Sequence, residues 1–183
     1  MPNSRGLVHL IIGPMYCGKT TELQRIINRH SLAGKSIVLL KHASDNRYDQ
    51  DYVCTHDQRR MRAISLTSLE QAPVAPYEVV GIDEGQFFAD VAEFADQQAN
   101  KGKVVVVAAL SSDFRRMPFP EVASLMAIAE RIHHLTAVCR MCGGDAAFSL
   151  RKSDHKDIQV IGGQELYEAC CRQCYNRFSG LFK

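Results

Sequence analysis

Residues 13–20 read GPMYCGKT, two glycines with four residues between them, then a lysine and a hydroxyl residue. An apolar run precedes this stretch and a segment with helical spacing follows it. In that context the pattern Gly-x-x-x-x-Gly-Lys-Ser/Thr is typical of a phosphate-binding loop, whose glycines let backbone N–H groups converge on an anion at a helix N-terminus. Lys19 can reach the β- and γ-phosphates, and the Thr20 hydroxyl can ligate Mg²⁺. The residues predicted to bind a nucleoside triphosphate here are Gly13, Pro14, Met15, Tyr16, Cys17, Gly18, Lys19, Thr20 and Thr21.

Around this loop, segments with strand and helix character alternate along the chain. Strands are expected at 7–12, 36–41, 78–83 and 103–110, and amphipathic helices at 19–34 and 87–102. The third and fourth strands are apolar on both faces, as strands in the centre of a covered parallel sheet are. Each helix ends on a glycine, a common helix terminator. The pattern predicts an α/β fold, a parallel sheet flanked by helices.

Two carboxylates follow the third predicted strand in VVGIDEGQFF, residues 79–88. We expect Asp83 to end a buried strand next to the phosphate-loop strand, where it could bind Mg²⁺ together with Thr20. Glu84 lies one residue further, where it could act as a general base toward a hydroxyl or a water. An isolated Asp-Glu pair would more often be the solvated start of a helix, but its pairing with a phosphate loop favours the site.

Four of the seven cysteines form two Cys-x-x-Cys pairs, Cys139 with Cys142 and Cys171 with Cys174. Two such pairs predict a closed, structural Cys₄ zinc site that clamps the intervening loop, residues 143–170. A pair of reactive dithiols is the alternative. The character of the sequence also changes at Cys139, so we expect a nucleotide-binding domain at 1–138 and a small zinc-binding domain at 139–183.

Composition limits the classes of function. A chain of 183 residues, 46% of them hydrophobic, can bury a full core. Its 22 basic and 20 acidic residues nearly cancel, which leaves no large positive field for a nucleic-acid backbone and suits a small acidic ligand better. The longest aliphatic run, residues 104–110, is too short to cross a bilayer, and the N-terminus lacks a signal-peptide pattern. We therefore expect a cytoplasmic protein without a membrane or nucleic-acid partner.

Taken in order, the phosphate loop, DEGQFF, DFRRMPF, the two cysteine pairs and VIGGQELY resemble the thymidine kinases of the zinc-containing, P-loop type (type II, cytosolic-like). The resemblance covers nearly the whole chain. It implies a domain like that of RecA-type ATPases and a zinc-clamped lasso loop over the nucleoside. The implied reaction is ATP-dependent phosphorylation of the 5′-hydroxyl of deoxythymidine, and of deoxyuridine, in pyrimidine salvage. It also implies a homotetramer or homodimer.

The same resemblance implies roles for individual residues. Glu84 is the catalytic base, and Asp45, Arg47, Asp83 and Gln86 join the phosphate loop around ATP. The residues implied to contact the nucleoside are Met15, Phe87, Leu110, Asp113, Phe114, Phe119, Arg151, Ile158, Val160, Ile161, Gly162, Gly163 and Tyr167.

Several of these assignments have structural alternatives. Asp113 could instead cap a turn. Arg116 and Arg151 could neutralise γ-phosphate charge or lie on the surface. Asp45 and Arg47 could belong to a solvated loop, and residue type alone would place Phe87 in the core.

Two rival functions share parts of these motifs. A P-loop ATPase acting on DNA would have the phosphate loop and Glu84, and a zinc ribbon could bind nucleic acid without catalysis. Both need a basic surface, whereas acidic residues offset the Arg and Lys of residues 139–183. The expected partners are thymidine and ATP, with Zn²⁺ as a structural ion and Mg²⁺ bound with ATP.

Overall fold

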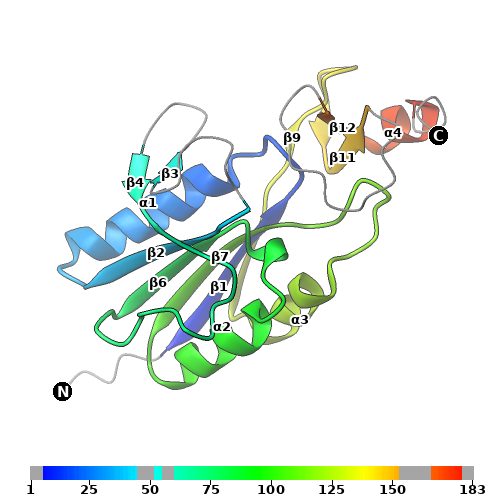
Figure 1. Ribbon diagram of the computed structural model, residues 1–183. Helices are drawn as coiled ribbons and strands as arrows, with labels where there is room; N and C mark the ends of the chain where they lie inside the picture. Colours follow the sequence, from blue (N-terminus) through cyan, green and yellow to red (C-terminus); the bar gives the residue numbers. More distant parts are fainter. Residues whose placement is uncertain (1–5, 45–51, 55–59, 153–165, 179–183) are drawn as a thin grey trace.

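The computed structural model describes residues 6–44, 52–54, 60–152 and 166–178 (Figure 1). Its main element is a six-stranded sheet of order β5-β2-β6-β7-β1-β8, in which every neighbouring pair is parallel. The strands are β1 (Leu7–Gly13), β2 (Ile37–His42), β5 (Ile64–Leu66), β6 (Val79–Asp83), β7 (Val104–Leu110) and β8 (Arg131–His134). The α/β prediction is confirmed, and the two strands expected at the centre, β6 and β7, occupy it.

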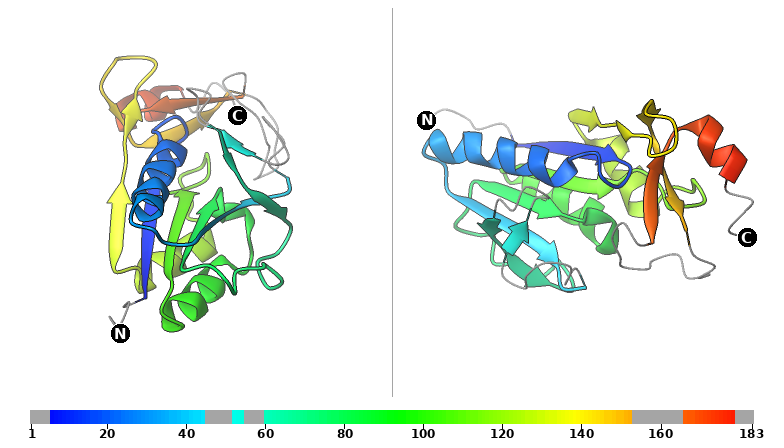
Figure 2. Two further views of the ribbon diagram at one scale, coloured as in Figure 1. Left: turned by 90° about the vertical axis from the view of Figure 1, so that its left-hand side faces the viewer. Right: turned by 90° about the horizontal axis from the view of Figure 1, so that it is seen from above.

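Helices cover both faces of this sheet (Figures 1 and 2). Helix α1 (Lys19–Leu32) packs Leu23 and Ile27 on one face, in a cluster with Ile11 and Val106. Helices α2 (Val91–Asn100) and α3 (Pro120–Ile128) cover the other face. Successive residues of a strand point to opposite faces, so β1 contributes to both cores.

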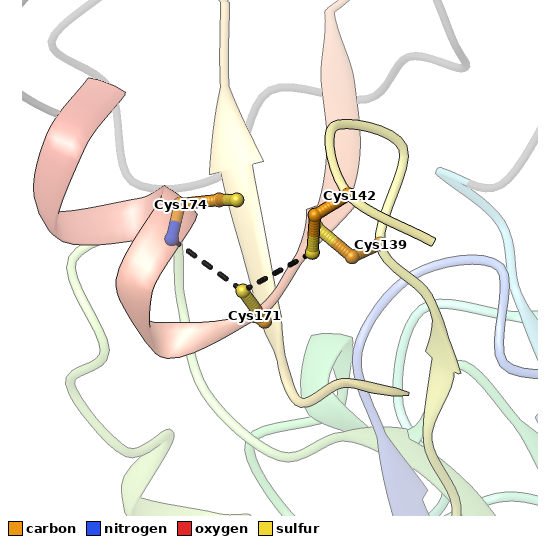
Figure 3. A group of neighbouring side chains, drawn as sticks. All are labelled: Cys139, Cys142, Cys171 and Cys174. Atoms are coloured by element: carbon orange, nitrogen blue, oxygen red, sulfur yellow. Dashed lines mark hydrogen bonds between the residues drawn. The ribbon is translucent and has the colours of Figure 1, made fainter. Parts of the chain in front are cut away.

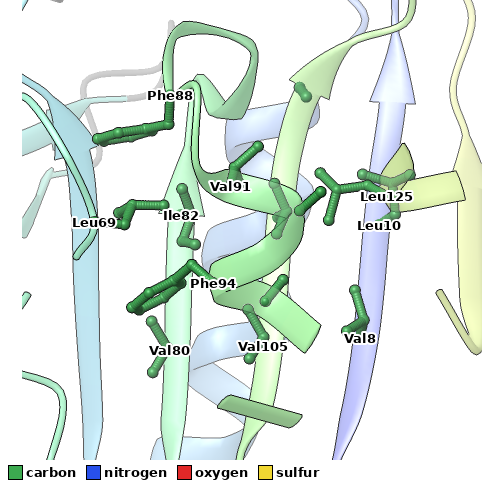
Figure 4. Packing of buried hydrophobic residues seen from close by; sticks show 14 of the residues in the cluster. Val8, Leu10, Leu69, Val80, Ile82, Phe88, Val91, Phe94, Val105 and Leu125 are labelled. Atoms are coloured by element: carbon green, nitrogen blue, oxygen red, sulfur yellow. The ribbon is translucent and has the colours of Figure 1, made fainter. Parts of the chain in front are cut away.

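The second helix begins later than the predicted residue 87. After β6 the chain makes a single turn of 3₁₀ helix, η1 (Gly85–Phe87), and is extended at Phe88 before α2 starts at Val91. Phe88 is apolar and only 1% exposed, because the extended segment inserts its ring into the core beside the sheet (Figure 4). The spacing of Phe88 and Val91, which predicted a shared helix, arises because both side chains are buried in the same core.

Two edge strands and a hairpin had no predicted counterpart. The outer strands β5 and β8 are short, and β8 carries exposed polar residues, so neither shows the apolar run of a covered strand. The strands β3 (Tyr52–Cys54) and β4 (Arg60–Arg62) pair antiparallel. The carbonyl of Val53 accepts a hydrogen bond of 3.0 Å from Gln24 of α1, which fixes this hairpin beside the phosphate-loop helix.

The part of the chain that contains the two Cys-x-x-Cys pairs forms a small module of its own. It contains β9 (Ala137–Val138), β10 (Asp145–Ala146), β11 (Phe148–Arg151), β12 (Tyr167–Cys170) and α4 (Arg172–Phe178). A separate cluster of buried residues, including Leu150, Cys170 and Tyr175, forms its core. Ala137 packs into that cluster two residues before the predicted boundary at Cys139, and the division into two domains stays a prediction.

No helix within the described ranges is long and apolar enough to cross a membrane.

A buried histidine lies between α1 and the sheet. His9 of β1 is 6% exposed, and its ring packs edge-on against His133 with 4.5 Å between the centroids. Its Nε2 atom has no hydrogen-bond partner among the described residues. Burial, together with the smaller effects of the nearby His133 and Arg131, lowers the pKa of His9 to about 4, whereas Glu22 acts in the opposite direction. The folded protein therefore keeps this imidazole neutral.

We expect His9 to make the fold sensitive to acid. The pKa of His9 is lower in the folded state than its ordinary value of 6.5, so between these two pKa values the unfolded chain binds a proton that the folded protein does not. The contribution of neutral His9 to the free energy of unfolding is therefore complete above pH 6.5 and is lost as the pH falls toward 4. The loss should be on the order of 1 to 3 kcal/mol. His9→Phe should reduce the difference between the free energies of unfolding in urea at pH 7.5 and pH 5. The exposed His134 is the matched control, and an equal reduction in His134→Gln would contradict the assignment.

Candidate active site and metal centre

The carboxyl ends of the parallel strands bring the predicted catalytic residues to one edge of the sheet. Gly13 ends β1, Asp83 ends β6 and Leu110 ends β7. Gly13 pairs directly with Leu110, and Asp83 pairs with Lys41 of β2. The sequence placed the Asp83 strand next to the phosphate-loop strand, and this was wrong, because β7 lies between β6 and β1. The helix that follows β1 nonetheless brings Thr20 to Asp83.

The two glycines of the phosphate loop are needed for different reasons. Gly18 has φ +84°, a left-handed conformation that side chains disfavour, and α1 begins at the next residue. At Gly13 a Cβ atom would lie 2.5 Å from the carbonyl oxygen of Leu135 and 2.6 Å from the sulfur of Cys17. Gly13 is therefore required by close packing and Gly18 by the turn into the helix.

Three polar contacts organise this loop. The Lys19 ammonium donates a 2.7 Å hydrogen bond to the carbonyl of Pro14 and so lies across the loop. The Thr20 hydroxyl lies 3.1 and 3.3 Å from the two carboxylate oxygens of Asp83. The N–H of Met15 donates to the Ser149 hydroxyl at 3.0 Å, which links the loop to the small module. Thr20 and Asp83 thus offer adjacent hard oxygens, a donor set that suits Mg²⁺.

Glu84 begins the turn after β6 in a left-handed conformation, with φ +52° and ψ +44°. A residue with a side chain rarely adopts this conformation, and such strain is common at functional sites. Its N–H donates to Asp83 Oδ1 at 3.1 Å, and its carboxylate accepts a 2.5 Å hydrogen bond from Gln86 Nε2. The Gln86 oxygen in turn accepts from the Leu110 N–H at 3.0 Å. Gln86, predicted to lie among the phosphate ligands, therefore connects Glu84 to the end of β7.

Three residues assigned to the nucleoside lie together where the loop after β7, which carries Phe114, meets β11 and β12 of the small module. The Arg151 guanidinium stacks on the Phe114 ring at 3.8 Å and donates a 2.7 Å hydrogen bond to the Tyr167 hydroxyl. Arg151 is 3% exposed, so the surface alternative for this residue is wrong. The two rings and the guanidinium form one stacked group.

The other described candidates have individual surroundings. Asp113 is buried, and its carboxylate accepts hydrogen bonds from the N–H groups of Arg115 and Met117, which is the turn-capping alternative for this residue. Phe119 is a buried member of the main core just before α3. Phe87 is half-buried with its ring 5.8 Å from that of His42. The remaining candidates, Asp45, Arg47, Ile158, Val160, Ile161, Gly162 and Gly163, lie outside the described residues.

The four predicted zinc ligands converge (Figure 3). The sulfur atoms of Cys139, Cys142, Cys171 and Cys174 all lie within 4.8 Å of one another. In tetrahedral coordination, Zn–S bonds of about 2.3 Å place the sulfurs about 3.8 Å apart. The distance between the Cys142 and Cys171 sulfurs is 3.7 Å, too long for a disulfide. The donor set and its dimensions therefore fit a zinc ion.

The surroundings of these thiols prepare two of them for ionisation. Burial by itself raises the pKa of Cys139, but the N–H groups of Cys171, Met141 and Cys142 outweigh it and lower this pKa to about 6. The N–H of Cys174 lies 3.4 Å from the Cys171 sulfur and lowers the pKa of that thiol. Burial raises the pKa of Cys174 to about 12, so metal binding must displace its proton.

Sequence reasoning missed two residues that connect the module to the loops at the sheet edge. The first is Ser149, through its bond to Met15, and the second is Tyr175, whose hydroxyl donates a 2.6 Å hydrogen bond to the Phe114 carbonyl. Neither belongs to a motif, and their partners lie 134 and 61 residues away. No local pattern could have indicated them.

We expect one zinc ion per chain and its loss in Cys174→Ser, because three remaining thiolates cannot close the tetrahedron. Metal analysis of the purified variants would measure this, with Cys170→Ala as the matched control. Cys170 neighbours the cluster but is buried in the core of the module, where burial raises its pKa to about 12. Zinc retained in Cys174→Ser, or lost equally in Cys170→Ala, would contradict the Cys₄ assignment.

Comparisons with known proteins agree with this geometry. The family model described as thymidine kinase matches residues 6–175. A thymidine kinase of Yaba monkey tumor virus is 46% identical over 94% of this chain and 97% of the viral protein. Thymidine kinase 1 of Dictyostelium discoideum is 45% identical over 93% of this chain and 78% of that protein. Among solved structures, the flagellar accessory protein FlaH from Methanocaldococcus jannaschii shares the fold, with a TM-score of 0.53 at 11% sequence identity. The superposition covers 77% of this chain and 75% of FlaH. This chain belongs to the thymidine kinase family.

Proposed function

We propose that this protein transfers the γ-phosphate of ATP to the 5′-hydroxyl of deoxythymidine, and also accepts deoxyuridine, in pyrimidine salvage. One observation carries the proposal within the family: a carboxylate, Glu84, lies beside the Thr20–Asp83 pair at the same sheet edge as a phosphate loop. A fixed base next to a bound triphosphate is what a hydroxyl acceptor requires.

The donor phosphates occupy the loop of residues 13–20 at the N-terminus of α1. On nucleotide binding, the Lys19 ammonium exchanges the Pro14 carbonyl for the β- and γ-phosphate oxygens, where it offsets developing charge. Thr20 and Asp83 hold Mg²⁺, which neutralises phosphate charge when it is bound. Asp45 and Arg47 assist at the same phosphates, and Thr21 completes the first turn of the helix.

Glu84 is the general base. A 5′-hydroxyl is a poor nucleophile at neutral pH, so a carboxylate within hydrogen-bond reach of it takes the proton as the new bond to phosphorus forms. The hydrogen bond from Gln86 and the left-handed backbone at Glu84 restrict where this carboxylate lies. The Glu84 carboxylate is therefore oriented before the substrates bind, and it needs little reorganisation during the reaction.

The nucleoside lies against the stacked group of Phe114, Arg151 and Tyr167. Phe114 and Tyr167 offer flat faces to a pyrimidine, and Met15 and Leu110 can form an apolar recess for its 5-methyl group. The full set of nucleoside contacts is proposed to be Met15, Phe87, Leu110, Asp113, Phe114, Phe119, Arg151, Tyr167 and the lasso residues Ile158, Val160, Ile161, Gly162 and Gly163.

The domain organisation, the role of the zinc ion, the oligomeric state and the localisation are also proposed from membership of the family. Residues 1–138 form the nucleotide-binding domain, and residues 139–183 form the zinc-binding domain that holds the lasso. The zinc is structural, because four cysteine ligands leave no position for water. We place the enzyme in the cytoplasm as a homotetramer or homodimer, without nucleic-acid or membrane partners.

A single assay separates this function from its rivals. The protein is mixed with ATP and Mg²⁺, and ADP release is measured with a panel of nucleosides or with single-stranded DNA. We expect deoxythymidine to stimulate release and to be converted to its 5′-monophosphate. Stimulation by DNA and not by nucleosides would instead indicate a P-loop ATPase acting on DNA.

Glu84→Gln tests the mechanism, because it keeps the shape and the hydrogen-bonding capacity of the side chain but removes the base. We expect kcat to fall by about 10²- to 10⁴-fold, on the order of 3 to 5 kcal/mol, with ATP binding nearly unchanged. The matched control is Asp83→Asn, whose defect should be partly relieved by higher magnesium because that change weakens the metal site. Near wild-type turnover in Glu84→Gln would mean that the base lies elsewhere.

A further inference from the structure

The loop after β7 is tied to the helix that carries one of the zinc ligands. Tyr175 follows Cys174 directly, and its N–H donates to the Cys171 carbonyl at 2.8 Å. Its hydroxyl donates to the Phe114 carbonyl at 2.6 Å. A side chain on the first turn of α4 therefore holds the backbone of a loop that lies some 60 residues earlier in the chain.

Arg116 adds a second connection between the same two segments. Its guanidinium lies over the Tyr175 ring at 4.4 Å and lies 5.6 Å from the Phe148 ring centroid. It also donates to Asn176 Oδ1 at 3.2 Å. The backbone of Arg116 has φ +67°, a conformation that costs energy for a residue with a side chain and persists where surrounding contacts stabilise it. The loop is thus held in an unfavourable conformation by contacts to α4 and β11.

Phe114 is held from both sides as a result. Its carbonyl accepts from Tyr175, and its ring stacks on the Arg151 guanidinium at 3.8 Å. Arg151 lies on β11 and donates to Tyr167 on β12, so the ring and the carbonyl are both fixed by the small module. The position of Phe114 relative to β7 therefore depends on how that module is built.

We propose that Tyr175 and Arg116 form a latch through which the zinc cluster positions Phe114 for nucleoside binding. Cys171 and Cys174 flank the start of α4, so fixing both sulfurs on one ion fixes the turn from which Tyr175 projects. Tyr175 is then a positioning residue that acts through Phe114. The consequence for nucleoside affinity rests on the proposed function, whereas the latch itself rests on the contacts described above.

Tyr175→Phe is the sharpest test. It keeps the ring that packs in the small core and under Arg116, and removes only the hydroxyl, leaving the Phe114 carbonyl without this donor. We expect the KM for thymidine to rise about three- to tenfold, the range that a lost neutral hydrogen bond predicts, while the KM for ATP and kcat stay nearly unchanged. Tyr77→Phe, at the opposite end of the sheet just before β6, is the matched control.

Amide hydrogen exchange of the zinc-loaded protein tests the latch independently of enzymatic activity. In Tyr175→Phe the N–H groups of Arg116 and Met117, which bond to Asp113, should exchange faster than in the wild type. Zinc content should remain one ion per chain. Removing zinc from the wild type should accelerate exchange at the same two amides. Zinc removal should increase their exchange rates less in Tyr175→Phe, where the hydroxyl is already absent, than in Tyr77→Phe.

The outcomes separate the two proposals. Unchanged exchange in Tyr175→Phe would overturn the latch, whatever the enzyme phosphorylates. Faster exchange without a change in the KM for thymidine, or with an equal rise in the KM for ATP, would overturn the positioning role of Tyr175 in nucleoside binding. Failure of the wild type to phosphorylate thymidine would overturn the proposed function, and hydrogen exchange would still decide on the latch.

Discussion

The site depends on the parallel register of three strands. Gly13 pairs with Leu110, and one strand further Ile82 pairs with Val107, so the ends of β1, β7 and β6 form one edge of the sheet. All three strands are almost entirely buried, so a shift of register is costly because it would disrupt the close packing of side chains on both faces of the sheet. The phosphate loop, the two carboxylates and the loop carrying Phe114 inherit their relative positions from this packing.

Buried polar groups then set the detail at that edge. The β6–β7 pairs end at Ile82 and Val107, and beyond them the Leu110 N–H donates to the side-chain oxygen of Gln86, whose amide nitrogen donates to Glu84. A buried donor left unpaired would be destabilising, so the same contacts that satisfy the end of β7 also orient the proposed base. Gln86 therefore serves the structure and the proposed catalytic site together.

The small module contributes to the site through contacts that are mostly polar. Ser149 binds the backbone of the phosphate loop, Tyr175 binds the backbone of the Phe114 loop, and Arg151 stacks on the Phe114 ring. The module has only a small apolar core of its own, which the proposed zinc ion would reinforce by cross-linking both ends of the segment 139–174. The proposed nucleoside site and the proposed zinc site are thereby linked through a few named contacts.

The features that depend on local sequence could be predicted without the structure. The phosphate loop, the central strands, the start of α1 and the spacing of the zinc ligands each depend on residues within a short window, where glycine conformations, apolar runs and cysteine intervals have direct physical meaning. Tertiary structure alone decided what depends on partners far along the chain. It inserted β7 between β6 and β1, placed Phe88 in the core ahead of α2, directed Gln86 to Glu84 and brought Tyr175 to Phe114. These outcomes follow from sheet order and from the need to pair buried polar groups, and neither leaves a periodic signal in the sequence.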